Sequence, residues 1–382
     1  MLSPLMAAIT RSLMRINQIY LQNFRNYAEQ TVLFDPACTV ICGENAQGKT
    51  NLLEAILCLS QGKSPRTRND RELIRFAEHG FIVEGKIFSR ERDFVSRIEV
   101  QSGKKKKITI NKVVAKNASE LGSVLNTVFF SPEDLYLIRD GATARRRFLD
   151  VSLSQLRPRY AAALSEYTRI WEHKTRILRD SGKHPDLRRI LPEFNLRMAQ
   201  TGAALIYYRA RFSRLLNQYA ETVHRACSGG SEQLAIHYQT VSTVSDPFAP
   251  YATVVAQLEE HQRLHAKAEL AVGQCLSGPH KDDLAVELDG RNAKSYASQG
   301  QTRTIALAMK LAEREIHRDI IGEYPVLLLD DVLSELDPKR QEFVLNRLGE
   351  GQVFITCCEE DRLHTLLHGT VLTIRDGCVV GG

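Results

Sequence analysis

Two adjacent carboxylates directly after an apolar run are the first residues of this sequence that suggest chemistry. The segment VLLLDDVLSELD, residues 326–337, places Asp330 and Asp331 after four apolar residues, and Asp337 follows in the next turn. Such a continuous apolar run is typical of a buried strand. One acid at its end could be a solvated carboxylate. Two acids with a third nearby favour a site for a metal ion or a phosphate group, because hard cations prefer oxygen ligands.

A phosphate-binding loop that would complete such a site lies far upstream. The segment GENAQGKT, residues 43–50, matches the pattern G-x-x-x-x-G-K-[ST]. The apolar run CTVIC precedes it, and a segment with apolar residues at helical spacing follows it, so the order is strand, loop, helix. Gly43 and Gly48 allow backbone conformations in which successive N–H groups, together with the helix dipole, hold phosphates.

These two segments predict a site that binds and hydrolyses ATP with Mg²⁺. Lys49 would neutralise the β and γ phosphates, and the Thr50 hydroxyl and the Asp330 carboxylate would bind Mg²⁺. Asp331 would orient or deprotonate the attacking water, so Asp331 and Lys49 are the predicted catalytic residues. The predicted nucleotide contacts in and beside the loop are Gly43, Glu44, Asn45, Ala46, Gln47, Gly48, Lys49, Thr50 and Asn51.

The elements that must position these residues come in two separate stretches. Residues 14–130 are expected to form the first part of an ATPase head, with the loop and an antiparallel patch of the short strands FIVEGKIF, FVSRIEVQ, KITINKVV and TVFF. Residues 272–382 are expected to form its second part, with the strand LAVEL, a helix, the acid-bearing strand and the strand VFITC. Residues 1–13 precede the first clear strand pattern, and we treat them as a dispensable extension.

A mainly helical arm, residues 131–271, is expected between the two parts. It is predicted to begin at SPEDL with Ser131 as the helix N-cap, and to be interrupted at SGKHPD and CSGGSEQ. No heptad pattern persists, so a long coiled coil is not expected. The predicted fold class is therefore α/β: a P-loop NTPase with an inserted, mainly helical arm domain.

Composition narrows the class of protein further. The eight cysteines include no C-x-x-C pair, and most lie within apolar runs, which is typical of reduced thiols in the cytoplasm. No apolar run approaches the roughly 18 to 20 residues that cross a bilayer. We therefore expect a soluble, cytoplasmic protein.

The positive charge of the chain is concentrated in one window. The whole protein has a formal net charge of +6, and residues 101–147 alone contain ten Lys or Arg residues against four acids. A polyanion such as DNA is a candidate partner, with Arg145, Arg146, Arg147 and the lysine run 104–107 as candidate contacts. The alternative for the lysine run is a solvated hairpin edge that discourages strand pairing.

A further segment resembles the signature motif of ABC-type ATPases. Within YASQGQTRTIALAMKLAE, Ser298, Gln299, Gly300 and Gln301 lie at the start of an amphipathic helix, although the second glycine of L-S-G-G-Q is replaced. The segment SELD, residues 334–337, is similar to the D-loop of that class. This resemblance implies that Ser298, Gln299, Gly300, Gln301 and Asp337 contact a nucleotide held by an opposite subunit, and hence that ATP stabilises a homodimer.

Taken together, the motifs resemble the RecF family of bacterial recombination and repair proteins, which is related to SMC heads. The motifs are LQNFRNY, SPEDL, RRRFLD, GPHKDDL, ASQGQTRT and LLLDDVLSELD, in order from residue 14 to about residue 360. The resemblance implies an ABC/SMC-type head with a short arm in place of a coiled coil. It also implies closure of an ATP-bound dimer on double-stranded DNA near single-strand gaps, slow hydrolysis, and work with RecR and RecO in RecA loading. Arg25 matches a position that approaches nucleotide phosphate, the alternative being a surface arginine.

Two departures and two alternatives accompany the resemblance. SPEDL lacks the glutamine of an ABC Q-loop, and Thr356, Cys357 and Cys358 stand where a switch histidine is expected. The main alternative is an ABC-type ATPase that acts on a non-DNA cargo in transport or translation; a nuclease-associated head is less favoured, because the arm is too short. We expect His280 and its GPHKDDL segment to form a structural turn or interdomain contact, since one histidine without a spaced partner is a poor metal site.

Overall fold

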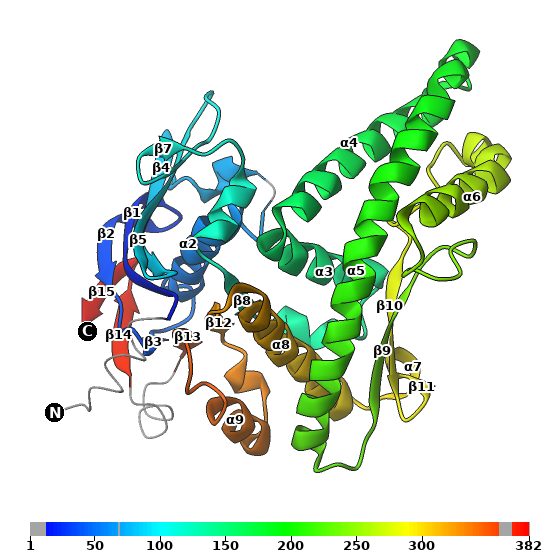
Figure 1. Cartoon of the computed structure of the whole chain (residues 1–382). Helices are drawn as coiled ribbons and strands as arrows, with labels where there is room; N and C mark the ends of the chain where they lie inside the picture. Colours follow the sequence, from blue (N-terminus) through cyan, green and yellow to red (C-terminus); the bar gives the residue numbers. More distant parts are fainter. Residues whose placement is uncertain (1–12, 68, 359–368, 382) are drawn as a thin grey trace. The chain divides into compact units, whose positions relative to one another are not determined.

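The computed structural model describes residues 13–67, 69–358 and 369–381 of the 382-residue chain. The expected extension lies outside these residues except for Leu13. The chain forms two compact units: residues 1–135 with 310–382, which we call the head unit, and residues 136–309, the arm unit. Figure 1 shows the helices and strands of each. No helix in the described part of the chain is both long and apolar enough to cross a membrane.

A mainly parallel sheet forms the centre of the head unit. Its strand order is β15-β14-β3-β13-β12-β8, and only β15 is antiparallel to its neighbour. Every residue of β3 and β12 is buried, as expected for parallel strands that are covered on both faces. The bounds are β3 (Cys38–Cys42), β8 (Thr127–Phe130), β12 (Val326–Asp330), β13 (Val353–Cys357), β14 (Thr370–Arg375) and β15 (Cys378–Gly381).

An antiparallel sheet of order β2-β1-β4-β5-β6-β7 completes the strands of this unit. Helix α2 (Lys49–Gln61) packs between the two sheets and buries Leu52, Leu53 and Ile56 in their common core. The bounds are β1 (Arg15–Phe24), β2 (Tyr27–Leu33), β4 (Gly80–Ser89), β5 (Arg92–Gln101), β6 (Lys107–Ile110) and β7 (Val113–Val114). The short 3-10 helix η1 (Asp70–Leu73) lies between α2 and β4, and η2 (Ala118–Ser123) lies between β7 and β8.

Two local predictions in this region are wrong. The segment TVFF, expected in the antiparallel patch, is β8 and pairs in parallel with β12, because its apolar residues can be covered on both faces only in the central sheet. SPEDL does not begin a long helix. It forms the 3-10 helix η3 (Pro132–Tyr136), and Ser131 donates its backbone N–H to Asp134 Oδ2 at 2.9 Å instead of capping.

The arm unit contains the helices α3 to α6 and a small sheet, together with α7 (Ala293–Tyr296) and the start of α8 (Gln299–Ile321). Helices α4 and α5 run side by side as a hairpin (Figure 1), and the expected interruptions at SGKHPD and CSGGSEQ are confirmed as a turn and a helix end. The helices are α3 (Ala142–Leu156), α4 (Pro158–Asp180), α5 (Leu191–Ser228) and α6 (Tyr251–Val272), with η4 (Pro185–Ile190) before α5. The sheet has the order β11-β10-β9, with β9 (Leu234–Gln239), β10 (Asp283–Leu288) and β11 (Arg291–Asn292).

The strand LAVEL belongs to the arm unit and not to the ATPase sheet where we expected it. It is β10, which pairs antiparallel with β9 along its whole length. Its alternating burial suits a sheet that is covered on one face, whereas the strands of the central sheet are continuously apolar. The short helix α7 (Ala293–Tyr296) and residues 299–309 of α8 (Gln299–Ile321) follow it in the arm unit, and residues 310–321 of α8 belong to the head unit.

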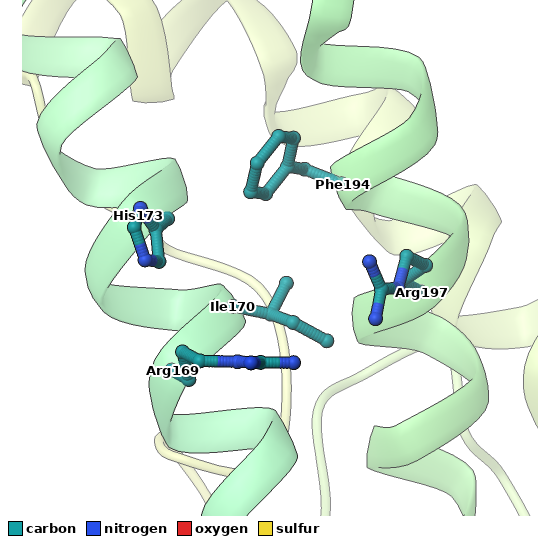
Figure 2. A pocket seen from close by; sticks show the side chains of 5 residues that line it. All are labelled: Arg169, Ile170, His173, Phe194 and Arg197. Carbon is teal, nitrogen blue, oxygen red and sulfur yellow. The ribbon is translucent and has the colours of Figure 1, made fainter.

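A cavity of about 270 Å³ lies between α4 and α5 within the arm unit. Figure 2 shows Arg169, Ile170 and His173 on one helix and Phe194 and Arg197 on the other. Arg197 also donates to Glu166 Oε1 at 2.9 Å. None of the residues predicted to bind nucleotide lines this cavity.

Candidate nucleotide-binding site

The loop 43–48 connects β3 to α2, and both of its glycines have conformations that other residues rarely adopt. Gly43 has φ 148°, and a Cβ there would lie 2.4 Å from the carbonyl oxygen of Ile374. Gly48 has φ 118°, and its Cβ would lie 2.6 Å from Asn26 Nδ2. A side chain at either position would therefore strain the backbone and displace a neighbour.

Lys49, the first residue of α2, is held over the loop. Its Nζ atom donates to the carbonyl oxygens of Gly43 at 2.6 Å and Glu44 at 2.9 Å, and it lies 3.7 Å from Cys358 Sγ. Cys358 Sγ in turn lies 3.1 Å from Asn45 Oδ1. A positive charge is thus fixed at the mouth of a loop that presents backbone N–H groups, an arrangement that suits phosphate.

Asn26 braces the second half of the loop, and we did not identify it from the sequence. Its Nδ2 donates to the carbonyl oxygen of Gln47 at 2.8 Å, and its Oδ1 accepts from Asn51 Nδ2 at 2.9 Å. The Gln47 carbonyl also accepts from Gly377 N at 3.0 Å. Ala46 has a positive φ of 66°, which completes the reversal of the chain. Asn26 lies in the LQNFRNY motif. The motif drew attention to this segment, but it did not predict the contacts of Asn26 with the loop.

The predicted metal ligands lie together although 280 residues separate them in sequence. Thr50 Oγ1 donates to Asp330 Oδ1 at 3.0 Å. Thr356 Oγ1 donates to the same oxygen at 2.9 Å. Burial raises the pKa of Asp330, and these two hydrogen bonds act in the opposite direction. A hydroxyl and a carboxylate in contact are the hard oxygen donors that Mg²⁺ prefers, so these residues fit the ion.

Thr356 also positions the second acid. Its Oγ1 accepts from the backbone N–H of Asp331 at 2.8 Å, and Asp331 has a positive φ of 52°. The chain therefore turns sharply after Asp330, as side-chain contacts hold both acids at the end of β12. Thr356 occupies one of the positions where a switch histidine was expected. It is the residue that β13 contributes to this site.

Arg25 is engaged by a carboxylate. Its Nε and Nη2 atoms donate to the two oxygens of Glu54, each at 2.8 Å, and Nη1 donates to Glu72 O at 2.9 Å. Glu54 is almost fully buried on α2, and the hydrogen bonds with it raise the pKa of Arg25. Arg66, which sequence reasoning missed, lies 3.6 Å from Glu54 and donates to Asn51 Oδ1 at 3.1 Å. The predicted phosphate contact of Arg25 remains a prediction.

The signature segment forms its own capped helix start in the arm unit. Ser298 N donates to Gln301 Oε1 at 2.8 Å, and Gln301 N donates to Ser298 Oγ at 3.2 Å, which is the reciprocal pattern of a capping box. Gln301 Nε2 also donates to Glu232 Oε1 at 2.8 Å. Ser298 and Gln299 are exposed, and Gly300 is half-buried. The α8 N-terminus therefore reaches the surface with a defined conformation.

Asp337 has a similar role in the head unit. Its side chain accepts from Arg340 N at 3.1 Å and caps α9 (Pro338–Leu345). The 3-10 helix η5 (Leu333–Glu335) precedes it, and Ser334 Oγ donates to the Asp331 carbonyl at 2.7 Å. Asp337 is exposed in the single chain. A residue that contacts another protomer must be exposed in this way.

The arginines of RRRFLD contribute less to the surface than we expected. Arg145 is 6% exposed, and its Nε and Nη2 atoms bind the two oxygens of Asp283 at 2.7 and 2.9 Å. Arg146 Nη1 donates to the Asp282 carbonyl at 2.7 Å. Only Arg147 of the three is exposed. The prediction that all three contact DNA is therefore wrong for Arg145, whose charge is buried against an acid within the arm unit.

The lysine run is divided in the same way. Lys106 Nζ lies 2.7 Å from Asp70 Oδ2 and donates to Gly62 O at 2.7 Å. Lys104, Lys105 and Lys107 are exposed in the turn between β5 and β6 and at the start of β6. These three lysines form a basic edge in the head unit.

The GPHKDDL segment is a buried polar turn. His280 Nδ1 lies 2.7 Å from Tyr167 OH, its Nε2 lies 3.1 Å from the Cys275 carbonyl, and burial lowers the pKa of His280 to about 4. The next acid, Asp282, is hydrogen-bonded by Tyr238, and burial raises its pKa to about 6. Within the described ranges, no group of three His, Cys, Asp or Glu residues could hold a metal ion. These contacts favour a structural turn.

Comparisons with known proteins agree with this geometry. The family RecF/RecN/SMC N terminal domain matches residues 15–376. The chain is 38% identical over 370 residues to the DNA replication and repair protein RecF of Bacillus cereus (strain B4264), covering 96% of this chain and 98% of that protein. RecF of Bacillus thuringiensis (strain Al Hakam) is similar to the same extent.

Solved structures show the same relationship. The recombination mediator protein RecF-ATPrS of the RecFOR pathway has a TM-score of 0.90 and 31% identity, covering 97% of this chain and 99% of that one. RecF-ATP of the same pathway has a TM-score of 0.87 and 32% identity, covering 97% and 98%. The Smc head domain of Pyrococcus furiosus, bound to the C-terminal domain of ScpA, has a TM-score of 0.55 and 16% identity, covering 96% and 95%, and so shows the fold alone.

The fold and the site define an α/β P-loop ATPase of the ABC/SMC-head class with a helical arm, as predicted. Relatives that are more than 30% identical match this chain over nearly its whole length, so the class can be narrowed to one family. The chain belongs to the RecF family, whose members act in DNA replication and repair. The resemblance drawn from the sequence motifs is thereby confirmed.

Proposed function

We propose that the chain is an ATP-dependent recombination mediator. ATP binding closes a homodimer on double-stranded DNA beside single-strand gaps, and slow hydrolysis releases it. The carrying observation is the convergence of Thr50 and Asp330, whose side chains meet at 3.0 Å beside a loop built for phosphate. Solved relatives described as RecF-ATPrS and RecF-ATP support ATP as the nucleotide.

The roles of the residues in the site follow from their contacts. Lys49 exchanges its two carbonyl partners for phosphate oxygens, and the loop N–H groups hold the remaining phosphates. Thr50 and Asp330 would hold Mg²⁺, which would neutralise charge that develops on the phosphates. Asp331 orients the attacking water or takes its proton. Thr356 contacts both acids through one hydroxyl group, which accepts from the Asp331 backbone and donates to the Asp330 carboxylate.

The dimer part of the proposal rests on exposed, pre-formed surfaces. Ser298, Gln299, Gly300 and Gln301 lie at the N-terminus of a long helix, where the helix dipole favours an anion. We infer that they contact the γ phosphate bound by the partner protomer, with Asp337 beside it. The nucleotide then stabilises the dimer because it binds only the closed form.

DNA is the proposed binding partner, because the chain belongs to the RecF family and carries exposed lysines in the head unit. The exposed Lys104, Lys105 and Lys107 would contact phosphates, so affinity should fall steeply with salt. By the same relationship, RecR and RecO are proposed partners in loading RecA, since the solved relatives are placed in the RecFOR pathway. A cytoplasmic location follows from a chromosomal DNA partner.

Fluorescence anisotropy tests the proposal directly. Labelled duplex and gapped DNA are titrated with the protein in ATP, in ADP and without nucleotide, and with the Lys49→Met variant. We expect ATP alone to tighten binding, and the variant to lose this effect because the phosphates lose their positive partner. Affinity that is absent, or equal under every condition, would refute the DNA clamp and favour a non-DNA cargo.

A further inference from the structure

Two thiols meet at the base of the phosphate-binding loop and a third lies beside the loop, and the proposed ATP chemistry uses none of them. Cys42 is the last residue of β3, directly before Gly43, and Cys357 is the last residue of β13. The two are register partners in the parallel sheet, and their Sγ atoms lie 3.1 Å apart. Cys358 follows and is exposed, with its Sγ 3.7 Å from Lys49 Nζ.

We propose that Cys42 and Cys357 are a modification site: they form a reversible disulfide that disables the phosphate-binding loop. A disulfide needs a sulfur separation of about 2.0 Å, so the Sγ atoms must approach by roughly 1 Å. Neighbouring strands lie about 4.7–4.9 Å apart, within the Cα separation of about 4.4–6.8 Å that disulfides tolerate. The bond can therefore form without separating the strands.

A small-molecule disulfide is the proposed oxidant. Cys357 is half-buried and Cys42 is buried, so Cys357 is the thiol that the oxidant reaches first. Its contact with Cys42 and its burial raise the pKa of Cys357, so this thiol must first lose its proton to solvent. The Cys357 sulfur then bonds to one sulfur of the oxidant, and the other sulfur leaves as a thiolate. The Cys42 thiol loses its proton to solvent, and its sulfur attacks Cys357 Sγ and displaces the second small thiolate. Two cysteine thiols are thus oxidised to one protein disulfide, and one small disulfide is reduced to two thiols. Excess small thiol reverses both exchanges.

The bond would act on the site from both sides. Cys42 precedes Gly43, where the loop begins, and Cys357 follows Thr356, which contacts Asp330 and Asp331. A displacement of roughly 1 Å in a catalytic arrangement can cost about 100-fold in rate. This effect on ATP rests on the proposed function, whereas formation of the disulfide does not.

Trypsin and mass spectrometry can locate the bond when neighbouring thiols are removed. The tryptic peptide 26–49 contains Cys38 and Cys42, and the peptide 348–362 contains Cys357 and Cys358. In the full-length double variant Cys38→Ala with Cys358→Ser, a link between these peptides can only join Cys42 to Cys357. The matched control is Cys42→Ala with Cys358→Ser, which keeps Cys38 and Cys357. Both are treated with oxidised glutathione, and circular dichroism checks that they are folded.

We expect the linked peptide in the first variant and not in the control. Binding of a fluorescent ATP analogue by the first variant should fall on oxidation, turnover should fall by up to about 100-fold, and dithiothreitol should restore both. A folded first variant without the link, or a linked protein with unchanged ATP binding and turnover, would overturn the proposal. Failure of the reduced protein to bind ATP would instead count against the proposed function, while the peptide link is still read independently.

Discussion

Asp330 and Asp331 are neighbours in sequence but have different surroundings. Asp330 is buried and accepts hydrogen bonds from Thr50 and Thr356. Asp331 is half-buried, and it is its backbone that Thr356 holds. A carboxylate with fixed oxygen-donor neighbours suits a cation, and one with a freer side chain suits a water molecule. The difference supports separate roles for the two acids.

The Asp331→Asn substitution tests this separation. An amide of the same shape cannot accept a proton, so ATP hydrolysis should fall by about 10²- to 10⁴-fold. Binding of a fluorescent ATP analogue should change little, because Asp331 is held through its backbone N–H, which the substitution leaves in place. Turnover is measured by phosphate release. Wild-type turnover in the variant would remove Asp331 from the role of base.

Asp282 in the arm unit gives a prediction for pH. Burial raises its pKa from 3.8 to about 6, so above about pH 6 folding carries the full cost of a buried charge, and below about pH 4 it carries none. The free energy of unfolding should therefore gain about 3 kcal/mol from Asp282 as the pH falls from about 6 to about 4. Asp282→Asn lacks the titration, so any stability advantage of the variant at pH 7 should shrink toward pH 4.

Unfolding in urea, followed by fluorescence of Trp171, measures this difference, since Trp171 is the one tryptophan of the sequence and lies on α4 of the arm unit. The free energy of unfolding of the variant must be compared with that of the wild type at each pH. His280 changes the stability of both proteins with pH, in the direction opposite to Asp282. Burial lowers the pKa of His280 to about 4, so folded protein is destabilised on acidification. A pH-independent difference would show that Asp282 does not titrate as proposed.

At the scale of elements, one arginine joins several segments of the arm unit. Arg209 on α5 is 2% exposed. It binds Asp150 of α3 at 2.7 Å, Tyr160 of α4 at 2.9 Å, and the carbonyl of Pro279 in the GPHKDDL turn at 2.8 Å. The family motifs RRRFLD and GPHKDDL therefore meet through a buried charge network. Their shared role within this unit is structural.

Arg209→Met tests the network. The substitution removes the charged partner of Asp150 and the donor to the Pro279 carbonyl, and breaking a buried pair costs about 3–5 kcal/mol. Arg211→Met is the matched control on the same helix. Arg211 is half-buried and stacks on Tyr207 at 3.6 Å, so its loss should cost about 1 kcal/mol or less. Trp171 fluorescence in urea gives both values. Equal effects would show that the buried network does not stabilise the arm unit.

At the scale of the whole molecule, the proposed ATPase site needs two chains. The loop and acids belong to the head unit, and Ser298 to Gln301 belong to the arm unit. If the signature acts on the nucleotide of the partner, variants that damage different halves should complement each other. A site within one chain would not allow this.

Mixing Lys49→Met with Ser298→Arg protein gives the test. Each variant alone should be inactive, because every site of its dimer lacks either the lysine or an accessible helix N-terminus. A mixed dimer has one intact site, so random pairing of equal amounts should restore about one quarter of wild-type sites. Phosphate release is measured against mixing ratio. Strictly additive activity at every ratio would exclude a shared site.

The sequence by itself determined the parts of this protein that depend on local order. The loop 43–50 lies between a buried strand and a helix, and the acids directly follow an apolar strand, so neighbouring residues specify each arrangement. Period and apolarity likewise identified α2, β12 and α8. Family motifs added the class of protein.

Only the tertiary structure decided which distant groups meet. It paired β10 with β9, buried Arg145 against Asp283, engaged Arg25 with Glu54, and placed Thr356 between both acids. The sequence around a charged side chain does not show whether that side chain is solvated or forms an ion pair, because its partner can lie more than 100 residues away. The sheet that a strand joins likewise depends on whether one or both of its faces are covered in the complete fold. Local sequence does not specify which elements provide this cover.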